Sequence, residues 1–414
     1  MPSHGIRDKV AIVGMGCTTF GEHWDASADD LVLEAVRAAC ASGGVSDVEV
    51  DAYWLSTLAS GNSGLALSRP LRLPYKPVTR VENYCAGGSD ALRNACYAVA
   101  SGAYDTAMAV GVEKLKDSGM SGLSAPAVPG DGTEPDLTAP AAFSLLAQAY
   151  GHKYGLADGT LRDVLDRIAW KNHANGALNP RAHFRRAVSR ETLRKAPRVA
   201  GELGVFDCSG VSDGAAAALV VRAEDAYRYT DRPLFVKALA LAVGPATGTA
   251  DPEYDFTSFP EVRRSAADAY RQAGITDPGA ELALAEVHDC FTVTELVLME
   301  DLGFAPPGEA WRAALDGAFD RDGALPVNPD GGLKAFGHPI GASGLRMLFE
   351  CWLQLRGEAP QERALSASAL GRGLALTHNL GGGPGECLSF VSVVGVEPPA
   401  PATRHHTSAV TGTA

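Results

Sequence analysis

The stretch Lys9-Val-Ala-Ile-Val-Gly-Met-Gly-Cys-Thr-Thr-Phe20 reads as a buried strand that breaks at glycine. A stretch of the same shape returns much later in the chain, at Phe235-Val-Lys-Ala-Leu-Ala-Leu-Ala-Val-Gly-Pro-Ala-Thr247. An amphipathic helical pattern follows each of them, at 29–42 and at 260–273. Both helical patterns end at a glycine that is followed by Ser-Asp or Thr-Asp, which is a typical helix stop and turn start. The chain therefore looks as if it were written twice.

The repeat continues beyond these elements in the same order. A strand pattern follows at 50–56 in one half and at 282–288 in the other. Each half then has a glycine-rich turn into a helix, Cys85-Ala-Gly-Gly-Ser-Asp-Ala-Leu-Arg93 or His338-Pro-Ile-Gly-Ala-Ser-Gly-Leu-Arg346, and a further apolar strand at 106–112 or 373–377. Five short matches in one order indicate two β/α halves that arose by duplication.

An insertion interrupts the first half. We predict an N-terminal half from 1–118 and 200–232, an inserted loop domain at 119–199, and a C-terminal half at 233–397. Within the insertion, 120–140 is rich in Gly, Pro, Ser and Ala and is expected to be mostly loop, whereas 141–170 is helical in pattern. Such an insertion either shapes a binding site or is a passive surface excursion. The tail at 398–414 is expected to be disordered.

The composition excludes several classes of function. The 414 residues carry a formal net charge of −13, which argues against a nucleic-acid binder. No apolar run approaches the roughly 18 residues that span a bilayer, and the N-terminus shows no secretion signal, so we expect a cytoplasmic protein without a membrane span. The eight cysteines are scattered and form no C-x-x-C pair, which indicates reduced thiols.

Cys85 is the first candidate for chemistry. It lies in Asn83-Tyr-Cys-Ala-Gly-Gly-Ser89, at a predicted turn into a helix. The partial positive charge of a helix N-terminus lowers the pKa of a thiol and makes it a better nucleophile. A buried cysteine at a tight turn would show the same local pattern, so the residues alone leave both interpretations open.

His338 is the second candidate, held between glycine and proline just before a helix. If the two halves pack together, the repeat brings this turn opposite the Cys85 turn, where an imidazole could take the thiol proton. His288 and Cys290 lie in His-Asp-Cys-Phe at the end of a strand, where they suit oxyanion binding and proton transfer. The ligands and spacing of a metal site are not found there. The glycines that follow His378 offer backbone N–H groups to an oxyanion.

Taken together, these segments resemble the thiolase superfamily over nearly the whole chain, to about residue 395. Tyr-Cys85-Ala-Gly-Gly resembles the nucleophile motif, Gly-His338-Pro with Gly-Ala-Ser-Gly resembles the histidine motif, and Val211-Ser-Asp-Gly-Ala-Ala-Ala217 resembles the strand start that closes the first half. Two further segments resemble the sterol-carrier-protein type of thiolase: His288-Asp-Cys-Phe291, and Asn172-His-Ala-Asn-Gly176 with Asn179-Pro-Arg-Ala-His-Phe184. We expect no sterol-carrier domain after these segments. The resemblance implies an α/β thiolase fold of five layers, αβαβα.

The resemblance also implies a division of labour. Cys85 would be acylated, His338 would activate it and contribute to a first oxyanion hole, and His288 would help to complete that hole. The backbone N–H groups of Cys85 and of Gly381, Gly382 and Gly383 would form a second hole. Many thiolases place an acid/base cysteine before the final glycines, where this chain has His378-Asn-Leu380. In the sterol-carrier-protein type, the cysteine of His-Asp-Cys-Phe has that role, so the resemblance implies Cys290 as the acid/base and Cys387 as a bystander.

The expected function is an acyltransferase that cleaves 3-oxoacyl-CoA by thiolysis or forms it by Claisen condensation, with coenzyme A thioesters as substrates and no permanently bound cofactor. The residues that bind coenzyme A stay unassigned, and no metal is expected. Related proteins imply a homodimer and a possible small partner with an OB fold and a zinc ribbon. The alternatives are a ketosynthase-like condensing enzyme, a catalytic subunit of a heteromeric acyltransferase, and a non-catalytic acyl-CoA or lipid-binding subunit. Aldolase relatives have lost the nucleophile, whereas Cys85 is retained.

Overall fold

The duplicated pattern is realised as two half-sheets with the same strand order. The computed structural model describes residues 5–118, 138–157 and 159–399. Within them the strands of the main sheet are β1 (Val10–Cys17), β2 (Ala52–Ser56), β3 (Val78–Val81), β4 (Thr106–Glu113), β7 (Gly214–Arg222), β8 (Leu234–Val243), β9 (Leu284–Glu286), β10 (Leu374–Gly383) and β11 (Glu386–Gly395). They are ordered β3-β2-β4-β7-β1-β8-β11-β10-β9.

The two halves match strand by strand. In the first half β1 and β4 both pair antiparallel with β7, and β2 is parallel to β4. In the second half β8 and β10 both pair antiparallel with β11, and β9 is parallel to β10. Within the sheet, β1 of the first half pairs with β8 of the second half at two positions, Ala11 with Phe235 and Ile12 with Leu234. This topology is what the repeat predicts.

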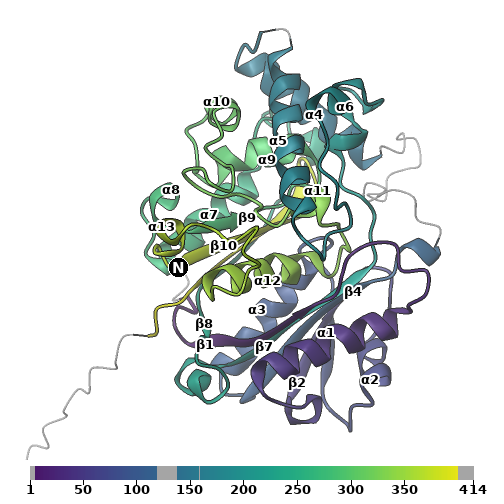
Figure 1. Cartoon of the computed structure of the whole chain (residues 1–414), viewed down its shortest axis with the longest axis vertical. Helices are drawn as coiled ribbons and strands as arrows, with labels where there is room; N and C mark the ends of the chain where they lie inside the picture. The colour runs from purple at the N-terminus through teal and green to yellow at the C-terminus, as the bar shows by residue number, and fades with distance from the viewer. Residues whose placement is uncertain (1–4, 119–137, 158, 400–414) are drawn as a thin grey trace, which may run out of the picture.

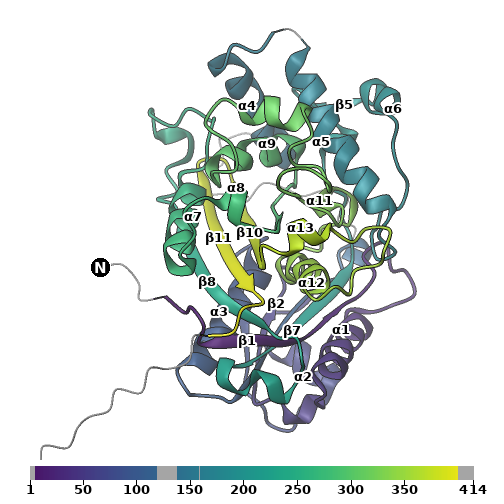
Figure 2. The ribbon, with the colours of Figure 1, turned by 60° about the vertical axis from the view of Figure 1, so that its left-hand side comes forward.

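Helices cover both half-sheets and separate them, which gives the five layers of an αβαβα arrangement. The outer layers are α1 (Ala28–Gly43) against the first half-sheet and α7 (Pro260–Ala273) against the second. Between the half-sheets, α3 (Gly87–Ala100) and α12 (Ser343–Leu355) pack against each other (Figures 1 and 2). The five-layered α/β fold expected from the sequence is therefore confirmed.

Local sequence explains the helix ends. Ser27 caps α1 by accepting from the amide of Asp30, and Gly44 ends it at a φ of 67°, where glycine avoids the strain of a side chain. The helix α7 starts with Pro260 at its first position and ends at Gly274 with a φ of 75°. The predicted ranges 29–42 and 260–273 match these helices within one residue.

Glycines set the close approach of the two inner helices. A Cβ on Gly88 of α3 would lie 2.5 Å from the Gly341 carbonyl oxygen, and a Cβ on Gly344 of α12 would lie 2.1 Å from Ser89 Oγ. Carbon and oxygen cannot approach so closely, so larger residues would push the helices apart. The N-terminal ends of α3 and α12 therefore meet, which places the turns that precede them face to face.

The inserted segment forms a lobe over the second half. It contains α4 (Ala139–Lys153), α5 (Thr160–Ala177), α6 (Arg190–Lys195) and the short strand β5 (Arg198–Ala200). The helical pattern expected at 141–170 is realised as α4 and α5, and Gly155 and Gly159 lie between them with φ values of 59° and 82°. The 120–137 part of the predicted loop, and 400–414 of the predicted tail, lie outside the described residues.

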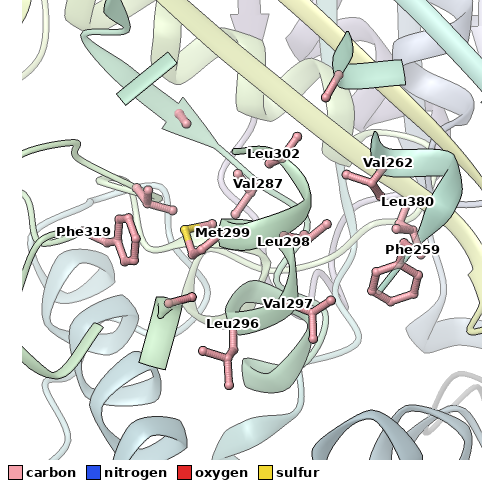
Figure 3. Close-up of a cluster of buried hydrophobic side chains, with 14 of the residues drawn as sticks. Phe259, Val262, Val287, Leu296, Val297, Leu298, Met299, Leu302, Phe319 and Leu380 are labelled. Carbon is pink, nitrogen blue, oxygen red and sulfur yellow. The ribbon is translucent and has the colours of Figure 1, made fainter. Parts of the chain in front are cut away.

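A large apolar core joins this lobe to the second half-sheet. Figure 3 shows its centre around α9 (Thr292–Asp301), whose Leu296, Val297 and Leu298 are completely buried. The ring of Phe143 in α4 lies 4.8 Å from the ring of Phe291, directly before α9, with the two ring planes tilted by 37°. The lobe is thus fixed by core packing. None of the described helices has both the length and the apolar character of a membrane-spanning segment. The domain boundaries stay a prediction.

Candidate active site

Cys85 lies in the turn between β3 and α3. The amide of Ala86 donates to the Asn83 carbonyl at 3.1 Å and that of Gly87 to the Tyr84 carbonyl at 2.9 Å, so the turn is tight. Tyr84 has a φ of 48°, a left-handed conformation that costs a non-glycine residue about 1–2 kcal/mol. Such local strain is held by the surrounding structure and is often found at functional sites. The thiol is partly exposed at the N-terminal end of α3.

His338 lies in the matching turn of the second half, between the short helix α11 (Gly332–Ala335) and α12. The preceding Gly337 has a φ of 119°, and a Cβ there would lie 2.6 Å from Ser212 Oγ, so only glycine fits. The backbone N–H of His338 donates to the same Ser212 oxygen at 3.3 Å. Ser212 thus fixes the backbone at this turn.

The two turns bring the thiol and the imidazole into contact. His338 Nε2 lies 3.2 Å from Cys85 Sγ, and His338 Nδ1 lies 2.7 Å from Ser343 Oγ. The Ser343 hydroxyl donates to the Pro339 carbonyl at 2.9 Å, so it accepts from Nδ1–H. This leaves the lone pair of Nε2 toward the thiol. A thiol, an imidazole and a hydroxyl in this order have the geometry that a nucleophile, a base and a group orienting the base require.

Cys85 and His338 are both neutral at rest. The prediction that the helix N-terminus lowers the pKa of the Cys85 thiol is therefore wrong. Burial raises the pKa of Cys85 to about 12, and the carboxylate of Glu82 acts in the same direction. Burial lowers the pKa of His338 to about 3. Desolvation outweighs the helix N-terminus here because the charged form of each group loses water.

His288 and Cys290 follow β9 and lie next to this pair. The rings of His288 and His338 are 5.3 Å apart and nearly perpendicular, and burial lowers the pKa of His288 well below its usual value. Cys290 is buried, and its Sγ lies 3.7 Å from Thr294 Oγ1. Burial raises the pKa of its thiol well above the usual value, and the contact with Thr294 offsets only part of this rise. The structure thus brings the four predicted catalytic side chains to one place.

Asp289, between them in sequence, fixes their segment from behind. Its carboxylate accepts from the amides of Leu333 at 2.6 Å and Lys334 at 3.2 Å, and from Asn172 Nδ2 at 2.7 Å. Burial, and then the charge of Glu295, raise the pKa of Asp289 to about 7. Since Asn172 lies in α5, this carboxylate ties the inserted lobe to the turn that carries His288 and Cys290.

The glycines after His378 were expected to form a turn, and this prediction is wrong, because they continue strand β10. Gly381, Gly382 and Gly383 are the end of strand β10 and pair with Leu388, Cys387 and Glu386 of β11. A Cβ on Gly381 would lie 2.6 Å from the Asn83 carbonyl oxygen, so this glycine lies against the Cys85 turn. Cys387 donates its thiol proton to Glu261 of α7 at 3.2 Å, which agrees with its prediction as a bystander.

Several polar side chains that lie at the site were not predicted from the sequence. Ser343 Oγ contacts the imidazole of His338, although the sequence suggested Gly-Ala-Ser-Gly only as part of the histidine motif, with no role for the serine. Ser89 donates to Asn379 Oδ1 at 2.6 Å, and Asn379 Nδ2 is buried without a partner. His378 Nε2 lies 3.1 Å from Ser389 Oγ. A polar Asn inside an apolar strand was the available signal, because buried amides need partners.

Two adjoining cavities lie near this site, although Cys85, His288, Cys290 and His338 line neither of them. The first has a volume of about 690 Å³, and its wall includes Phe291, directly after Cys290, and Val211, directly before Ser212. The second, of about 730 Å³, is lined by the exposed Arg185 and Arg186. The cavities share four lining residues, His173, His183, Phe184 and Phe206, all but the last from the predicted insertion.

Two family models match most of the chain. Residues 10–224 match the model "Thiolase, N-terminal domain" and residues 246–389 match "Thiolase C-terminal domain-like". An acetyl-CoA acetyltransferase of Methanothermobacter thermautotrophicus is 38% identical over 386 residues, which cover 91% of this chain and 97% of that protein. Sterol carrier protein 2 of Gallus gallus is 30% identical over 92% of this chain and 71% of its own.

Solved structures show the same fold. Human mitochondrial 3-ketoacyl-CoA thiolase superposes with a TM-score of 0.68 at 18% identity, over 94% of this chain and 99% of its own. A structure described as an Ltp2-ChsH2(DUF35) aldolase superposes with a TM-score of 0.77 at 24% identity, over 94% and 98% of the two chains. At these identities the likeness establishes the fold alone.

Proposed function

Because this chain belongs to the thiolase family and is an acyltransferase of the thiolase type, we propose that Cys85 carries the acyl group and that His338 is its base. The observation that carries the proposal is the 3.2 Å contact of His338 Nε2 with Cys85 Sγ, with Nδ1 held by Ser343. A thiolate is the reactive form of cysteine, and an adjacent base supplies it without a lowered thiol pKa.

In the first half-reaction, Cys85 Sγ attacks the carbonyl carbon of an acyl-CoA while its proton passes to His338 Nε2. The tetrahedral oxyanion is stabilised by the backbone N–H of Cys85 and by the glycine end of β10, of which Gly381 lies nearest to the turn. When the C–S bond to coenzyme A breaks, the proton on Nε2 passes to the leaving thiolate. The products are acyl-Cys85 and free coenzyme A.

In the second half-reaction, Cys290 acts as the acid/base. For condensation, its thiol proton first passes to His338 Nε2, and the resulting Cys290 thiolate removes a proton from the α-carbon of a second acyl-CoA. The thioester oxygen is held by His288 and by the N–H that His338 Nε2 now carries. The resulting carbanion attacks acyl-Cys85, which forms the carbon–carbon bond and releases the Cys85 thiolate, and this thiolate takes the proton from Nε2. Thiolysis of a 3-oxoacyl-CoA is the reverse sequence.

The cavities support a coenzyme A thioester as substrate. Since the net charge is −13, anionic phosphates need a local cationic site, and Arg185 and Arg186 are exposed at the second cavity. We expect Arg186→Ala to raise KM for acetyl-CoA and not for the short thioester of N-acetylcysteamine. Arg264→Ala, an exposed arginine of α7, is the matched control and leaves both values unchanged. An equal rise for both thioesters would contradict the assignment.

Two assembly proposals follow from observations at the surface. Within the described residues β3 is the outermost strand of its half-sheet, and the nearby Leu65 and Tyr75 are 73% and 104% exposed. An open strand edge with apolar neighbours supports a homodimer, which light scattering after gel filtration would detect. The aldolase neighbour contains a DUF35 component, which supports a small partner protein for this chain too. Since Cys85 is retained, we propose acyl transfer rather than aldol cleavage.

Turnover of a 3-oxoacyl-CoA with coenzyme A tests the proposed function. Cys85→Ala is expected to lower kcat at least about a thousandfold, because nucleophile and base act as a unit. Cys40→Ala, at a buried thiol of α1, is the control and retains activity. Normal turnover by folded Cys85→Ala would refute the proposal.

A further inference from the structure

The pair of Cys85 and His338 is part of a three-membered cluster of soft donor atoms. One ligand atom each of Cys85, His288 and His338 lies within 4.8 Å of the other two. The three come from the β3–α3 turn, the end of β9 and the turn before α12, so no sequence spacing reveals the group. Among the residues that the structure describes, this is the one group of three or more His, Cys, Asp or Glu side chains whose ligand atoms lie this close together.

The distances suit a tetrahedral metal site. Zinc binds cysteine sulfur at about 2.3 Å and histidine nitrogen at about 2.0–2.1 Å, which puts tetrahedral ligands roughly 3.3–3.6 Å apart. Cys85 Sγ and His338 Nε2 are already 3.2 Å apart. The remaining separations, at most 4.8 Å, would close by about 1 Å around the ion.

The surroundings of the two histidines also suit a metal. His338 Nδ1–H donates to Ser343, and such a bond from the second ring nitrogen fixes the tautomer and orientation of metal-binding histidines. His288 is 2% exposed, and its Nδ1 has no hydrogen-bond partner. A buried polar nitrogen without a partner is unusual, so this ring has coordinating capacity that the fold itself does not use.

We propose that Cys85 Sγ, His338 Nε2 and a ring nitrogen of His288 bind one Zn²⁺ ion, and that this binding reversibly inhibits the enzyme. On binding, the Cys85 S–H bond breaks, its proton goes to solvent, and the sulfur, as thiolate, gives its electron pair to the ion. A fourth position stays open to water. No oxidant or reductant is needed.

Inhibition follows because the ion occupies the two atoms that start acyl transfer, and this consequence rests on the proposed function. Acylation of Cys85 removes the thiolate ligand, so an acyl-CoA and Zn²⁺ exclude each other. The site contains sulfur and nitrogen donors, which Mg²⁺ does not favour. Mg²⁺ is therefore expected to leave the enzyme active at concentrations at which Zn²⁺ inhibits it.

Cobalt binding to the full chain, freed of metal by chelator, tests the site without an activity assay. We expect one Co²⁺ per chain, a sulfur-to-cobalt charge-transfer absorption, and competition by Zn²⁺. Cys85→Ser is expected to abolish that absorption, and His288→Gln to weaken binding on the order of a hundredfold, since one of three protein ligands is lost. His152→Gln, at an exposed histidine of α4, is the control and binds as wild type.

Retention of the absorption in Cys85→Ser, or unchanged affinity in His288→Gln, would overturn the proposal. Wild-type protein alkylated at Cys85 replaces the serine variant if that variant does not fold, and its loss of cobalt binding is the expected result. Failure of the proposed function gives a different pattern. A chain that binds Co²⁺ through Cys85 but is not acylated by acetyl-CoA contradicts the acyltransferase mechanism only, and one that is acylated but binds no metal contradicts this inference only.

Discussion

Ser343→Ala removes the group that keeps the lone pair of His338 directed at Cys85. In the structure the Ser343 hydroxyl accepts from Nδ1–H at 2.7 Å and donates to Pro339 at 2.9 Å, and His338 is 1% exposed. Without that hydroxyl, the buried Nδ1–H has no partner, which costs about 1–3 kcal/mol. The ring escapes this cost by moving its proton to Nε2, where it can no longer accept the thiol proton.

The magnitude follows from that cost. If the reactive tautomer becomes less favourable by about 1–3 kcal/mol, the rate of Cys85 acylation falls by about 5- to 150-fold. The assay is single-turnover acylation by acetyl-CoA, quenched on the millisecond scale and read by intact mass. The free energy of unfolding, measured with urea, is expected to fall by about 1–3 kcal/mol, because both hydrogen bonds of the hydroxyl are lost.

Thr106→Val is the matched control. Thr106 lies at the start of β4, away from the site. Its hydroxyl accepts from the Asp51 amide at 3.0 Å and donates to the Glu49 carbonyl at 3.2 Å. This variant is expected to lose comparable stability and to keep its acylation rate. Wild-type acylation by folded Ser343→Ala, or an equal slowing in both variants, would refute the assigned role of the hydroxyl.

Three further outcomes are expected. Acylation is independent of pH between about 5 and 8, because the pKa of His338 is lowered to about 3 and its base form persists, so a fall in rate centred near pH 6.5 would contradict the neutral pair. Gly344→Ala lowers the free energy of unfolding by about 1–3 kcal/mol, since its Cβ would lie 2.1 Å from Ser89 Oγ, whereas Gly151→Ala, with its nearest contact at 3.5 Å, does not; urea denaturation distinguishes them. Cys290→Ala accumulates acyl-Cys85 but loses condensation and thiolysis, and normal product formation by this variant would exclude its acid/base role.

Local signals explain why much of the fold could be predicted. The helices α1 and α7 carry an amphipathic pattern, a proline or serine start and a glycine end, and each of these acts within a few residues. The pairing of Cys85 with His338 came from the repeat, because two copies of one unit that pack together place equivalent turns opposite each other. The close glycine contacts between α3 and α12 are what allow these turns to touch.

Other features depend on long-range contacts and were not visible in the sequence. Gly381–383 reads as a turn, but β11 supplies the partners that keep it in a strand. The thiol pKa of Cys85 was expected to be lowered by a helix terminus, whereas burial by distant segments raises it. His288 was placed beside Cys85 and His338 only by the family resemblance, because it belongs to a different strand end and no spacing in the sequence indicates the contact.

The covalent state of Cys85 after incubation with acetyl-CoA is the most direct test of the mechanism. Intact mass followed by peptide mapping is expected to show a single acetyl group on Cys85, which disappears in His338→Ala and when coenzyme A is added in excess. Absence of an adduct from active protein, or an acetyl group on another of the eight cysteines, would contradict the account.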